Sequence, residues 1–226
     1  MTCLRSCIPC EKIENDVYDW YARHNAKLEE VKNKQAEIIL IGDSITHFWN
    51  LEESVSYGLE VWEEFFGGRS VLNLGFGFDR TQNMIWRVEN GEMANQSPRL
   101  IIVNAGTNNF SVTPNYDGDT PEVAFAGVKK LIETLKVHAP EAQIVVTSVL
   151  PRSPQRLQIL INELNRLLKE YIESTADSKL VFLDVAEKFL YPDGSFNPEL
   201  YKDRCCHPNC AGYRIWANAL YPYLQR

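Results

Sequence analysis

The sequence predicts an α/β fold, a three-layer α/β/α sandwich built around a five-stranded parallel sheet. Five short apolar runs rich in β-branched residues are typical of strands buried on both faces. Segments of helical period separate these runs, as the crossovers between parallel strands require. The expected strands are residues 37–41, 70–74, 100–103, 143–149 and 180–185.

Helix start signals precede the segments of helical period. Asn15 or Asp16 can cap a first helix, and the pairs Thr120-Pro121 and Ser153-Pro154 each combine a hydroxyl cap with a proline suited to a first helical turn. Between these caps the apolar residues recur on one face, which favours amphipathic helices packed on a sheet. The expected helices are residues 17–31, 79–88, 124–137, 156–172 and 212–224.

Composition indicates an ordinary globular protein. The chain has 226 residues, 45% of them hydrophobic, and a formal net charge of −7. One domain over residues 1–226 is expected, with residues 1–15 as a cysteine-containing extension. The acidic surplus and the lack of basic runs argue against nucleic-acid or membrane-surface partners. With neither a spanning segment nor the apolar core of a signal peptide, a cytoplasmic location is expected, while the oligomeric state stays open.

Six cysteines stand in two groups near the ends of the chain, too few for a disulfide scaffold. The spacing of Cys3, Cys7 and Cys10 matches that of radical-SAM iron–sulfur sites, although that motif normally follows the first strand of a barrel. Reduced thiols are therefore expected, and a cysteine-bound metal or cluster is the alternative. The second group is Cys205, Cys206 and Cys210.

Polar residues follow the expected strands at the rim where open parallel sheets bind ligands. Ser44 lies in a Gly-Asp-Ser turn after the first strand, Asn108 follows the third, and His207 follows a long loop after the fifth. A serine nucleophile needs a base and a hydrogen-bond donor for the developing oxyanion, which His207 and Asn108 can supply. Each residue alone is an ordinary turn or cap residue. Together at one rim they indicate nucleophilic acyl chemistry.

Four sequence blocks resemble the SGNH or GDSL hydrolases. In chain order they read IILIGDSITHFW, LNLGFGFDRTQN, VNAGTNN and HPNCAGY, and the resemblance runs from about residue 19 to 224. Within the family the blocks look most like the platelet-activating-factor acetylhydrolase α-subunit branch. The resemblance implies a flavodoxin-like α/β/α fold, no metal or organic cofactor, and hydrolysis of a small acyl ester, frequently acetyl.

The resemblance also implies roles for single residues. Ser44 corresponds to the nucleophile, whose own N–H is the first oxyanion donor, while Asn108 and His207 correspond to the side-chain donor and the general base. The family's glycine in the second block is Phe78 here. The Phe78 N–H can still donate to the oxyanion, or a shift of one residue gives that role to Gly77.

The acid of the site departs from the family pattern as well. It normally lies three residues before the histidine, where this chain has Arg204, whereas Asp203 lies four before. If one extra loop residue bulges out, Asp203 reaches the imidazole of His207. Without that bulge, a backbone carbonyl would orient the histidine and the site would work as a dyad.

Residues near these blocks have structural and functional interpretations. Asp43 is expected to hold the nucleophile turn, and His47 is a candidate for the acyl pocket. Arg80 and Arg152 would either bind an anionic leaving group or pair with a nearby acid or helix end. His24 is expected on the surface of the first helix.

These features favour a serine ester hydrolase that removes short acyl groups, acetyl above all, from a small or carbohydrate substrate. The substrate part rests on family analogy. A catalytically silent ligand-binding module with the same cleft is the alternative, suggested by Phe78 and the displaced Asp203. The cysteine-bound metal or cluster protein is the second alternative.

Overall fold

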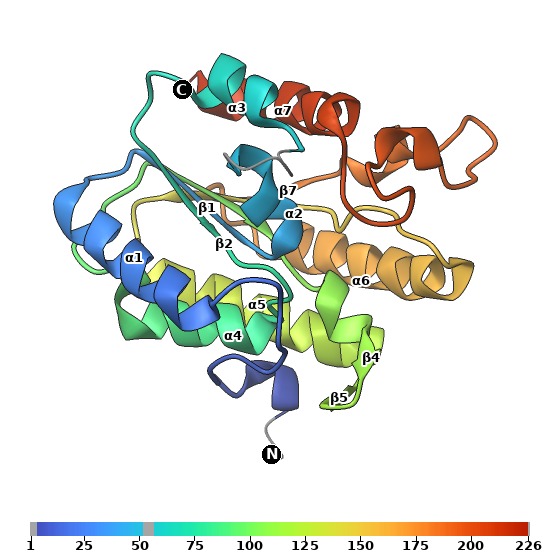
Figure 1. The fold of residues 1–226 in the computed structure, drawn as a ribbon, viewed down its shortest axis with the longest axis horizontal. Coiled ribbons are helices and arrows are strands. Elements are labelled where there is room, and N and C mark those ends of the chain that lie inside the picture. Colours follow the sequence, from blue (N-terminus) through green and yellow to red (C-terminus); the bar gives the residue numbers. More distant parts are fainter. Residues whose placement is uncertain (1–3, 52–56, 226) are drawn as a thin grey trace.

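A five-stranded parallel sheet forms the centre of the computed structural model, which describes residues 4–51 and 57–225 (Figure 1). The strand order is β2-β1-β3-β6-β7, so the predicted fold class is confirmed. The chain places β2 on one side of β1 and β3 on the other, which makes the carboxyl ends of β1 and β3 the switch point of the sheet. The strands are β1 (Ile38–Gly42), β2 (Val71–Gly75), β3 (Leu100–Asn104), β6 (Gln143–Thr147) and β7 (Leu180–Leu183).

Helices cover both faces of the sheet. Helices α1, α4, α5 and α6 lie on one face, and α3 and α7 lie on the other (Figure 1). A short antiparallel pair, β4 (Val112–Thr113) and β5 (Tyr116–Asp117), stands apart from the sheet. The α-helices are α1 (Trp20–Asn33), α2 (Ser44–His47), α3 (Leu59–Phe66), α4 (Thr81–Arg87), α5 (Pro121–His138), α6 (Gln155–Ser174) and α7 (Cys210–Leu224).

Alternate residues of each strand enter different halves of the core, because side chains of a strand point to opposite faces. In β1, Ile39 and Ile41 pack toward α4 and α5, whereas Ile38 and Leu40 pack toward α3 and α7. All four are fully buried, and complete burial of such a side chain contributes about 1.5–3 kcal/mol. The sheet is thus held from both sides, and its strand ends form a rigid platform for the loops that follow.

The first helix begins later than the sequence predicts. Asp19 is its N-cap and accepts hydrogen bonds from the N–H groups of Tyr21 and Ala22, while Val17 is 97% exposed. The expected start after Asn15 or Asp16 is therefore wrong, because the carboxylate of Asp19, further along the chain, supplies the cap. Helices α2 and α3 were not among the expected elements.

The N-terminal segment packs against α4 and α5. Ser6 is buried and donates a 2.5 Å hydrogen bond from its hydroxyl to the Val123 carbonyl, and Thr81 Oγ1 donates to the Ser6 carbonyl at 3.0 Å. Cys10 lies beside α4, on the opposite side of the sheet from Cys210, which begins α7 (Figure 1). Cys10 and Cys210 are therefore separated by the sheet.

No cluster of three or more His, Cys, Asp or Glu side chains in residues 4–51 and 57–225 is arranged to hold a metal ion. Cys3 of the expected three-cysteine motif lies outside the described residues. Within the same ranges, no helix is long and apolar enough to cross a membrane.

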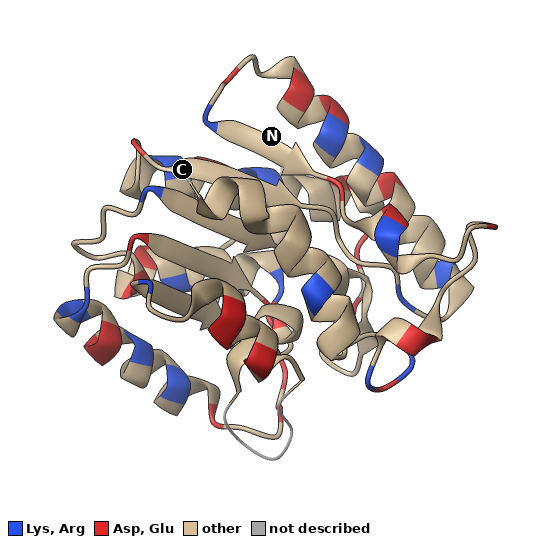
Figure 2. Ribbon diagram, turned by 90° about the horizontal axis from the view of Figure 1, so that it is seen from above, with Lys and Arg blue, Asp and Glu red and all other residues tan. Residues whose placement is uncertain are grey.

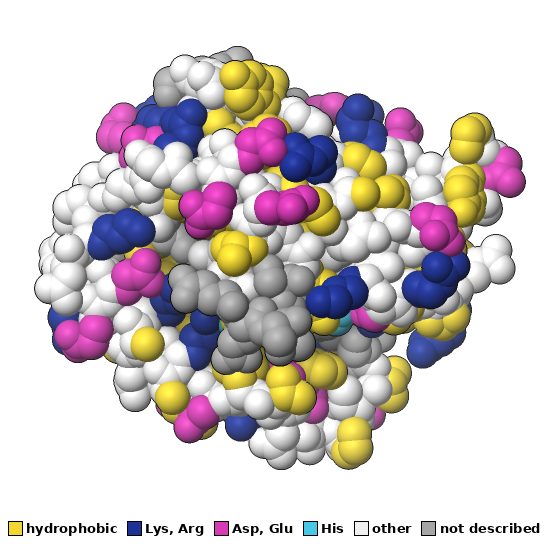
Figure 3. Space-filling model, turned by 45° about the horizontal axis from the view of Figure 1, so that its top comes forward, with side chains coloured by type: hydrophobic (Ala, Val, Ile, Leu, Met, Phe, Trp, Pro, Cys, Tyr) yellow, Lys and Arg dark blue, Asp and Glu magenta, His cyan; other side chains and the backbone are white. Residues whose placement is uncertain are grey.

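Charges of both signs are intermixed on the outer helices (Figure 2). On α6, Arg166 pairs with both Glu163 and Glu170 at helical spacing. On the face drawn in Figure 3, exposed apolar side chains are scattered between charged ones. Exposed ion pairs such as those of Arg166 contribute little to stability, so the buried contacts described below matter more for the site.

Candidate active site

The turn that carries Ser44 follows β1 directly. Ser44 is the first residue of α2, and the N-cap Asp43 accepts a hydrogen bond from the Ile45 N–H at 2.9 Å. A side chain at Gly42 would bring its Cβ within 2.7 Å of the Asn104 carbonyl oxygen. Glycine therefore lets the backbone approach β3 closely at this point. The first N–H groups of a helix have no intrahelical acceptor, and the described residues show none for the Ser44 N–H.

Ser44, His207 and Asp203 form a continuous hydrogen-bonded chain. Ser44 Oγ lies 2.9 Å from His207 Nε2, and His207 Nδ1 lies 2.6 Å from Asp203 Oδ2. The three residues come from the β1–α2 turn and from the loop before α7, far apart in the sequence. The structure therefore brings together the three residues that the sequence assigns to nucleophile, base and acid.

The loop around Asp203 explains how an acid four residues before the histidine reaches it. Asp203 Oδ1 accepts backbone N–H groups from Cys205, Cys206 and His207 at 3.0, 2.8 and 3.1 Å, which curls the loop around the carboxylate. Arg204 has a left-handed φ of 59° and its guanidinium contacts Glu199 instead of the site. The extra residue therefore bulges outward, and Asp203 Oδ2 stays free to meet the imidazole.

The two carboxylates of the site differ in their electrostatics. Burial alone would raise the pKa of Asp203, but hydrogen bonds from His207 and the backbone outweigh it and hold that pKa well below its usual range. Burial raises the pKa of Asp43 to about 6, since one backbone N–H is its sole hydrogen-bond donor and Oδ2 is buried without a partner among the described residues. Asp203 is thus stabilised as an anion, and Asp43 is not.

Asn108 lies in the short 3₁₀ turn after β3, at the same rim. It is 7% exposed, and its Nδ2 donates a 3.1 Å hydrogen bond to the Asp79 carbonyl. An amide nitrogen carries two N–H donors, so one remains for a ligand. Arg80 Nε donates to the Asn108 carbonyl at 3.1 Å, which fixes the backbone of the turn.

Gly77 and Phe78 lie in the turn after β2, and their N–H groups differ in availability. The Gly77 N–H donates to His47 Nδ1 at 3.2 Å, so the shift that would make Gly77 the oxyanion donor is not supported. The Phe78 N–H has no acceptor among the described residues. Phe78 adopts a left-handed φ of 60° and its ring is 41% exposed. The bulky residue is thus accommodated by turning its ring outward, at a cost in backbone strain.

His47 has a structural place beside the nucleophile turn. Burial lowers its pKa to about 2, so the imidazole is neutral and its Nδ1 accepts the hydrogen bond from the Gly77 N–H. The ring also contacts Tyr18 edge-on at 5.0 Å between centroids. With Nδ1 engaged and the ring buried, His47 supports the two turns.

A buried charge network behind the turn after β2 was missed by the sequence analysis. Asp79 accepts hydrogen bonds from Trp20 Nε1 and Arg87 Nε, both at 2.7 Å, and Arg87 also pairs with Glu92. Glu92 in turn lies 2.8 Å from His24 Nδ1. The expected surface position of His24 is therefore wrong, since it is 6% exposed. Pairing between residues so distant in sequence leaves no local signal.

Arg80 is explained by structural contacts. It is fully buried, forms a 2.9 Å ion pair with Glu14 and lies over the ring of Tyr116. Of the two expectations for Arg80, pairing with a nearby acid is the one that the structure shows, and its partner is Glu14 because Arg87 occupies Asp79. This arrangement fastens the N-terminal segment to the turn that contains Asn108.

Aromatic side chains flank the imidazole of His207. Phe48 lies 5.1 Å and Tyr57 lies 5.9 Å from the imidazole, measured between ring centroids, and these two rings stack on each other. Nothing in the sequence pattern marked them as neighbours of the site. They give the histidine an apolar wall on one side.

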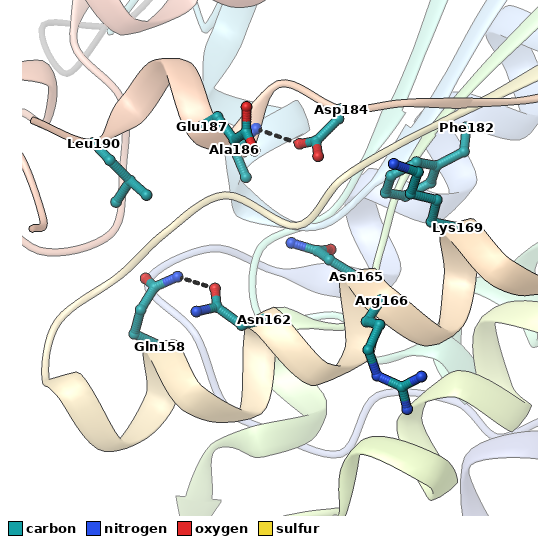
Figure 4. Close-up of a pocket in the computed structure, with 10 residues that line it drawn as sticks. All are labelled: Gln158, Asn162, Asn165, Arg166, Lys169, Phe182, Asp184, Ala186, Glu187 and Leu190. Atoms are coloured by element: carbon teal, nitrogen blue, oxygen red, sulfur yellow. Dashed lines mark hydrogen bonds between the residues drawn. The ribbon is translucent and has the colours of Figure 1, made fainter. Parts of the chain in front are cut away.

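A groove of about 360 Å³ lies elsewhere, between α6 and the segment after β7 (Figure 4). Polar side chains such as Asn162, Asn165 and Asp184 point toward it. It contains neither Ser44 nor His207. The reactive groups therefore lie at the switch point of the sheet, not in this groove.

Known proteins resemble this chain in sequence and in fold. Residues 40–215 match the model of the GDSL-like Lipase/Acylhydrolase family. The platelet-activating factor acetylhydrolase IB subunit alpha1 of Bos taurus is 30% identical over 222 residues, covering 96% of this chain and 87% of the relative. The alpha2 subunit of Rattus norvegicus is 30% identical over 180 residues, covering 79% and 72%. A GDSL-like lipase from Bacteroides thetaiotaomicron superposes with a TM-score of 0.68 at 21% identity, covering 91% and 97%.

Proposed function

This chain belongs to the GDSL-like lipase/acylhydrolase family, and from that premise we propose that it is a serine ester hydrolase with Ser44 as nucleophile, His207 as general base and Asp203 as orienting acid. The observation that carries the proposal is the chain of contacts of 2.9 Å and 2.6 Å that joins these three side chains. Distances in this range allow proton transfer between nucleophile and base.

The proposed reaction begins with attack of Ser44 Oγ on the ester carbonyl carbon, while His207 Nε2 takes the hydroxyl proton. The imidazolium that forms is stabilised by the Asp203 carboxylate. Collapse of the tetrahedral intermediate breaks the ester C–O bond, and the leaving alcohol receives the proton from His207. A water molecule, deprotonated by His207, then releases the acid and restores Ser44.

Three donors serve the oxyanion in this proposal: the N–H groups of Ser44 and Phe78 and the side-chain amide of Asn108. The Phe78 N–H, which has no acceptor in the described part of the chain, and the second amide hydrogen of Asn108 support these assignments. Preorganised donors of this kind each contribute about 3–4 kcal/mol to the transition state. The strained turn at Phe78 is consistent with such a role, since strain concentrates at functional sites.

For the substrate we propose short acyl esters, acetyl above all, of small water-soluble alcohols including carbohydrates. Support for acetyl comes from the relatives, which are named acetylhydrolases. The chain also lacks a long apolar insertion between its strands that could shelter a lipid tail. Rates on acetyl and octanoyl esters of one alcohol test this part, and a preference for octanoyl would contradict it.

The decisive experiment measures hydrolysis of p-nitrophenyl acetate with a chelator present. Ser44→Ala is expected to abolish turnover above background, while Ser174→Ala, which removes a hydroxyl at the end of α6, keeps the wild-type rate. Equal turnover by wild type and Ser44→Ala would overturn the proposal. Absence of turnover in the wild type would favour the alternative, a catalytically silent ligand-binding module.

A further inference from the structure

Arg152 occupies the loop after β6, between the two loops that carry the proposed catalytic groups. Its Nη1 donates to Thr107 Oγ1 at 3.2 Å, next to Asn108 in the chain. The following residue, Ser153, donates its N–H to the Cys205 carbonyl at 3.0 Å, in the loop of His207. Arg152 therefore contacts the oxyanion side directly and is joined to the base side through the neighbouring backbone.

The charge of Arg152 reaches both sides of the site. Burial raises the pKa of Asp43, the neighbour of Ser44, and the positive charge of Arg152 opposes that rise. Burial also raises the pKa of Cys206, the neighbour of His207, to about 12, and the positive charge of Arg152 again opposes the rise. A positive charge felt by residues beside both nucleophile and base lies close to the place where the ester must bind.

Most N–H donors of the Arg152 guanidinium have no hydrogen-bond acceptor among the described residues. Of its five N–H donors, the described contacts use one, to Thr107, and Nε is buried with no partner. No carboxylate among residues 4–51 and 57–225 forms an ion pair with it. By contrast, the buried Arg80 and Arg87 are each neutralised by acids, Glu14 for the first and Asp79 with Glu92 for the second.

Asp43 does not serve as the missing partner. The positive charge of Arg152 acts on Asp43, yet the described residues show no ion pair between them, and Oδ2 of Asp43 has no hydrogen-bond partner in the described chain. The guanidinium of Arg152 is half-buried and has no counter-charge among the described residues, so it can pair with a bound anion. Such a group is expected where an anion completes it.

We propose that Arg152 binds an anionic group of the substrate, a carboxylate or phosphate placed within a few bonds of the ester. The guanidinium offers a planar fork that matches either anion with two parallel hydrogen bonds. This inference rests on the proposed esterase function and names the substrate class within it: acyl esters of small acidic molecules. Thr107 orients the fork from the side of Asn108.

The test compares three acetyl esters: neutral O-acetylglycolamide, O-acetylglycolate and 2-acetoxyethyl phosphate. Acetate release is measured in the wild type, Arg152→Gln, Arg152→Lys and Arg156→Gln, where Arg156 is an exposed arginine nearby that controls for loss of one positive charge. The readout is the ratio of kcat/KM on each anionic ester to kcat/KM on the neutral one. A ratio cancels any general effect of the substitution on the catalytic groups.

Arg152→Gln is expected to lower this ratio about tenfold or more, through KM, because it removes a charged hydrogen-bond partner. Arg152→Lys keeps the charge but not the planar fork, so its ratio should lie between those of the wild type and Arg152→Gln. The ratio of Arg156→Gln should equal that of the wild type. In the wild type, a larger ratio for O-acetylglycolate would indicate carboxylate recognition, and a larger ratio for 2-acetoxyethyl phosphate would indicate phosphate recognition.

Two results would overturn the subsite. In the first, Arg152→Gln and Arg152→Lys keep the wild-type ratio, which would leave the guanidinium with a structural role only. In the second, Arg156→Gln lowers the ratio as much as Arg152→Gln does, which would make the effect long-range attraction. Failure of the proposed function gives a different signature, namely no acetate release from any of the three esters by the wild type.

Discussion

The nucleophile side and the acid–base side of the site are built in different ways. Ser44 and Asn108 are buried and follow adjacent strands, so neighbouring strand ends and the buried Asp79–Arg87 pair hold them. Asp203 and His207 have side chains 32% and 23% exposed and lie on a loop. That loop is organised by one carboxylate oxygen that accepts three backbone N–H groups. The nucleophile side therefore depends on the sheet, whereas the acid–base side depends mainly on contacts within its own loop.

The comparison explains why the spacing between acid and base can change. A strand end fixes the residue after it, so a shift of one position would remove Ser44 or Asn108 from the rim. A loop that wraps around its own carboxylate can take in one more residue, as it does at Arg204. The acid–base side is therefore the place where this family pattern tolerates an insertion.

The largest expected effect is on the acid–base side. Asp203→Asn should lower kcat/KM by about 10⁴, because the amide no longer holds the histidine in the correct tautomer. The substitution keeps an oxygen for the loop N–H groups, so the fold should survive. Steady-state kinetics with Asp193→Asn as control, an exposed Asp that also caps a turn, measure the effect. A loss of only a few-fold would mean that the site works as a dyad.

On the nucleophile side, Asn108→Ala should lower kcat by about 10²–10³ with a smaller effect on KM, because the amide acts mainly on the oxyanion of the transition state. Asn162→Ala, which removes an exposed amide on α6, is the matched control. Kinetics on the same acetyl ester provide the measurement. An unchanged kcat would remove Asn108 from the oxyanion site.

The two sides should also respond to pH with opposite signs. The pKa of Asp43 is raised to about 6 in the folded state, so its contribution to stability is full below about pH 4 and is lost as pH rises to about 6. As pH rises from about 4 to about 6, the free energy of unfolding of Asp43→Asn should therefore increase by about 3 kcal/mol relative to that of the wild type. Denaturant unfolding at both pH values measures the gain. A difference that does not change with pH would show that Asp43 titrates normally.

The depressed pKa of Asp203 works in the other direction. Its carboxylate stabilises the folded state above the unfolded pKa, near pH 4, and that stability is lost as pH falls. Asp203→Asn should therefore lower the free energy of unfolding at neutral pH, and the loss should become smaller as pH falls. The same unfolding series tests this sign, and equal behaviour of the two variants would contradict the contrast between the two sides.

The smallest expected effect concerns Phe78. Phe78→Gly should raise stability by about 1 kcal/mol, because glycine adopts the left-handed conformation without strain. Phe78→Ala removes the ring but keeps the strain, so it should show no such gain. Thermal or denaturant unfolding of the two variants separates strain from ring loss. Equal stabilities would indicate that the turn is not strained.

Much of the fold follows from the sequence because β-branched runs and helix caps are local signals. All five expected strands occur, each starting within one residue of the expected position. The start of α1 was misassigned because three acidic or amide residues near it can each act as a cap. The pairing of His24 with Glu92 was missed because it joins residues 68 apart, for which a sequence carries no local pattern.

The site was predictable to a similar degree and for similar reasons. Ser44, Asn108 and His207 stand in recognisable blocks at strand ends and at a helix start. The place of Asp203 was left open, since a left-handed arginine cannot be read from residue order. The choice between Gly77 and Phe78 was open as well, because it depends on which N–H is taken by His47.

The most direct test of the central claim is detection of the acyl-enzyme. Wild-type protein mixed with p-nitrophenyl acetate and quenched in acid within the first turnovers should carry one acetyl group on the peptide that contains Ser44. His207→Ala should show almost none, because the unactivated hydroxyl is a weak nucleophile. Turnover with acetyl on another residue, or turnover with no acetylated peptide in the wild type, would contradict the account.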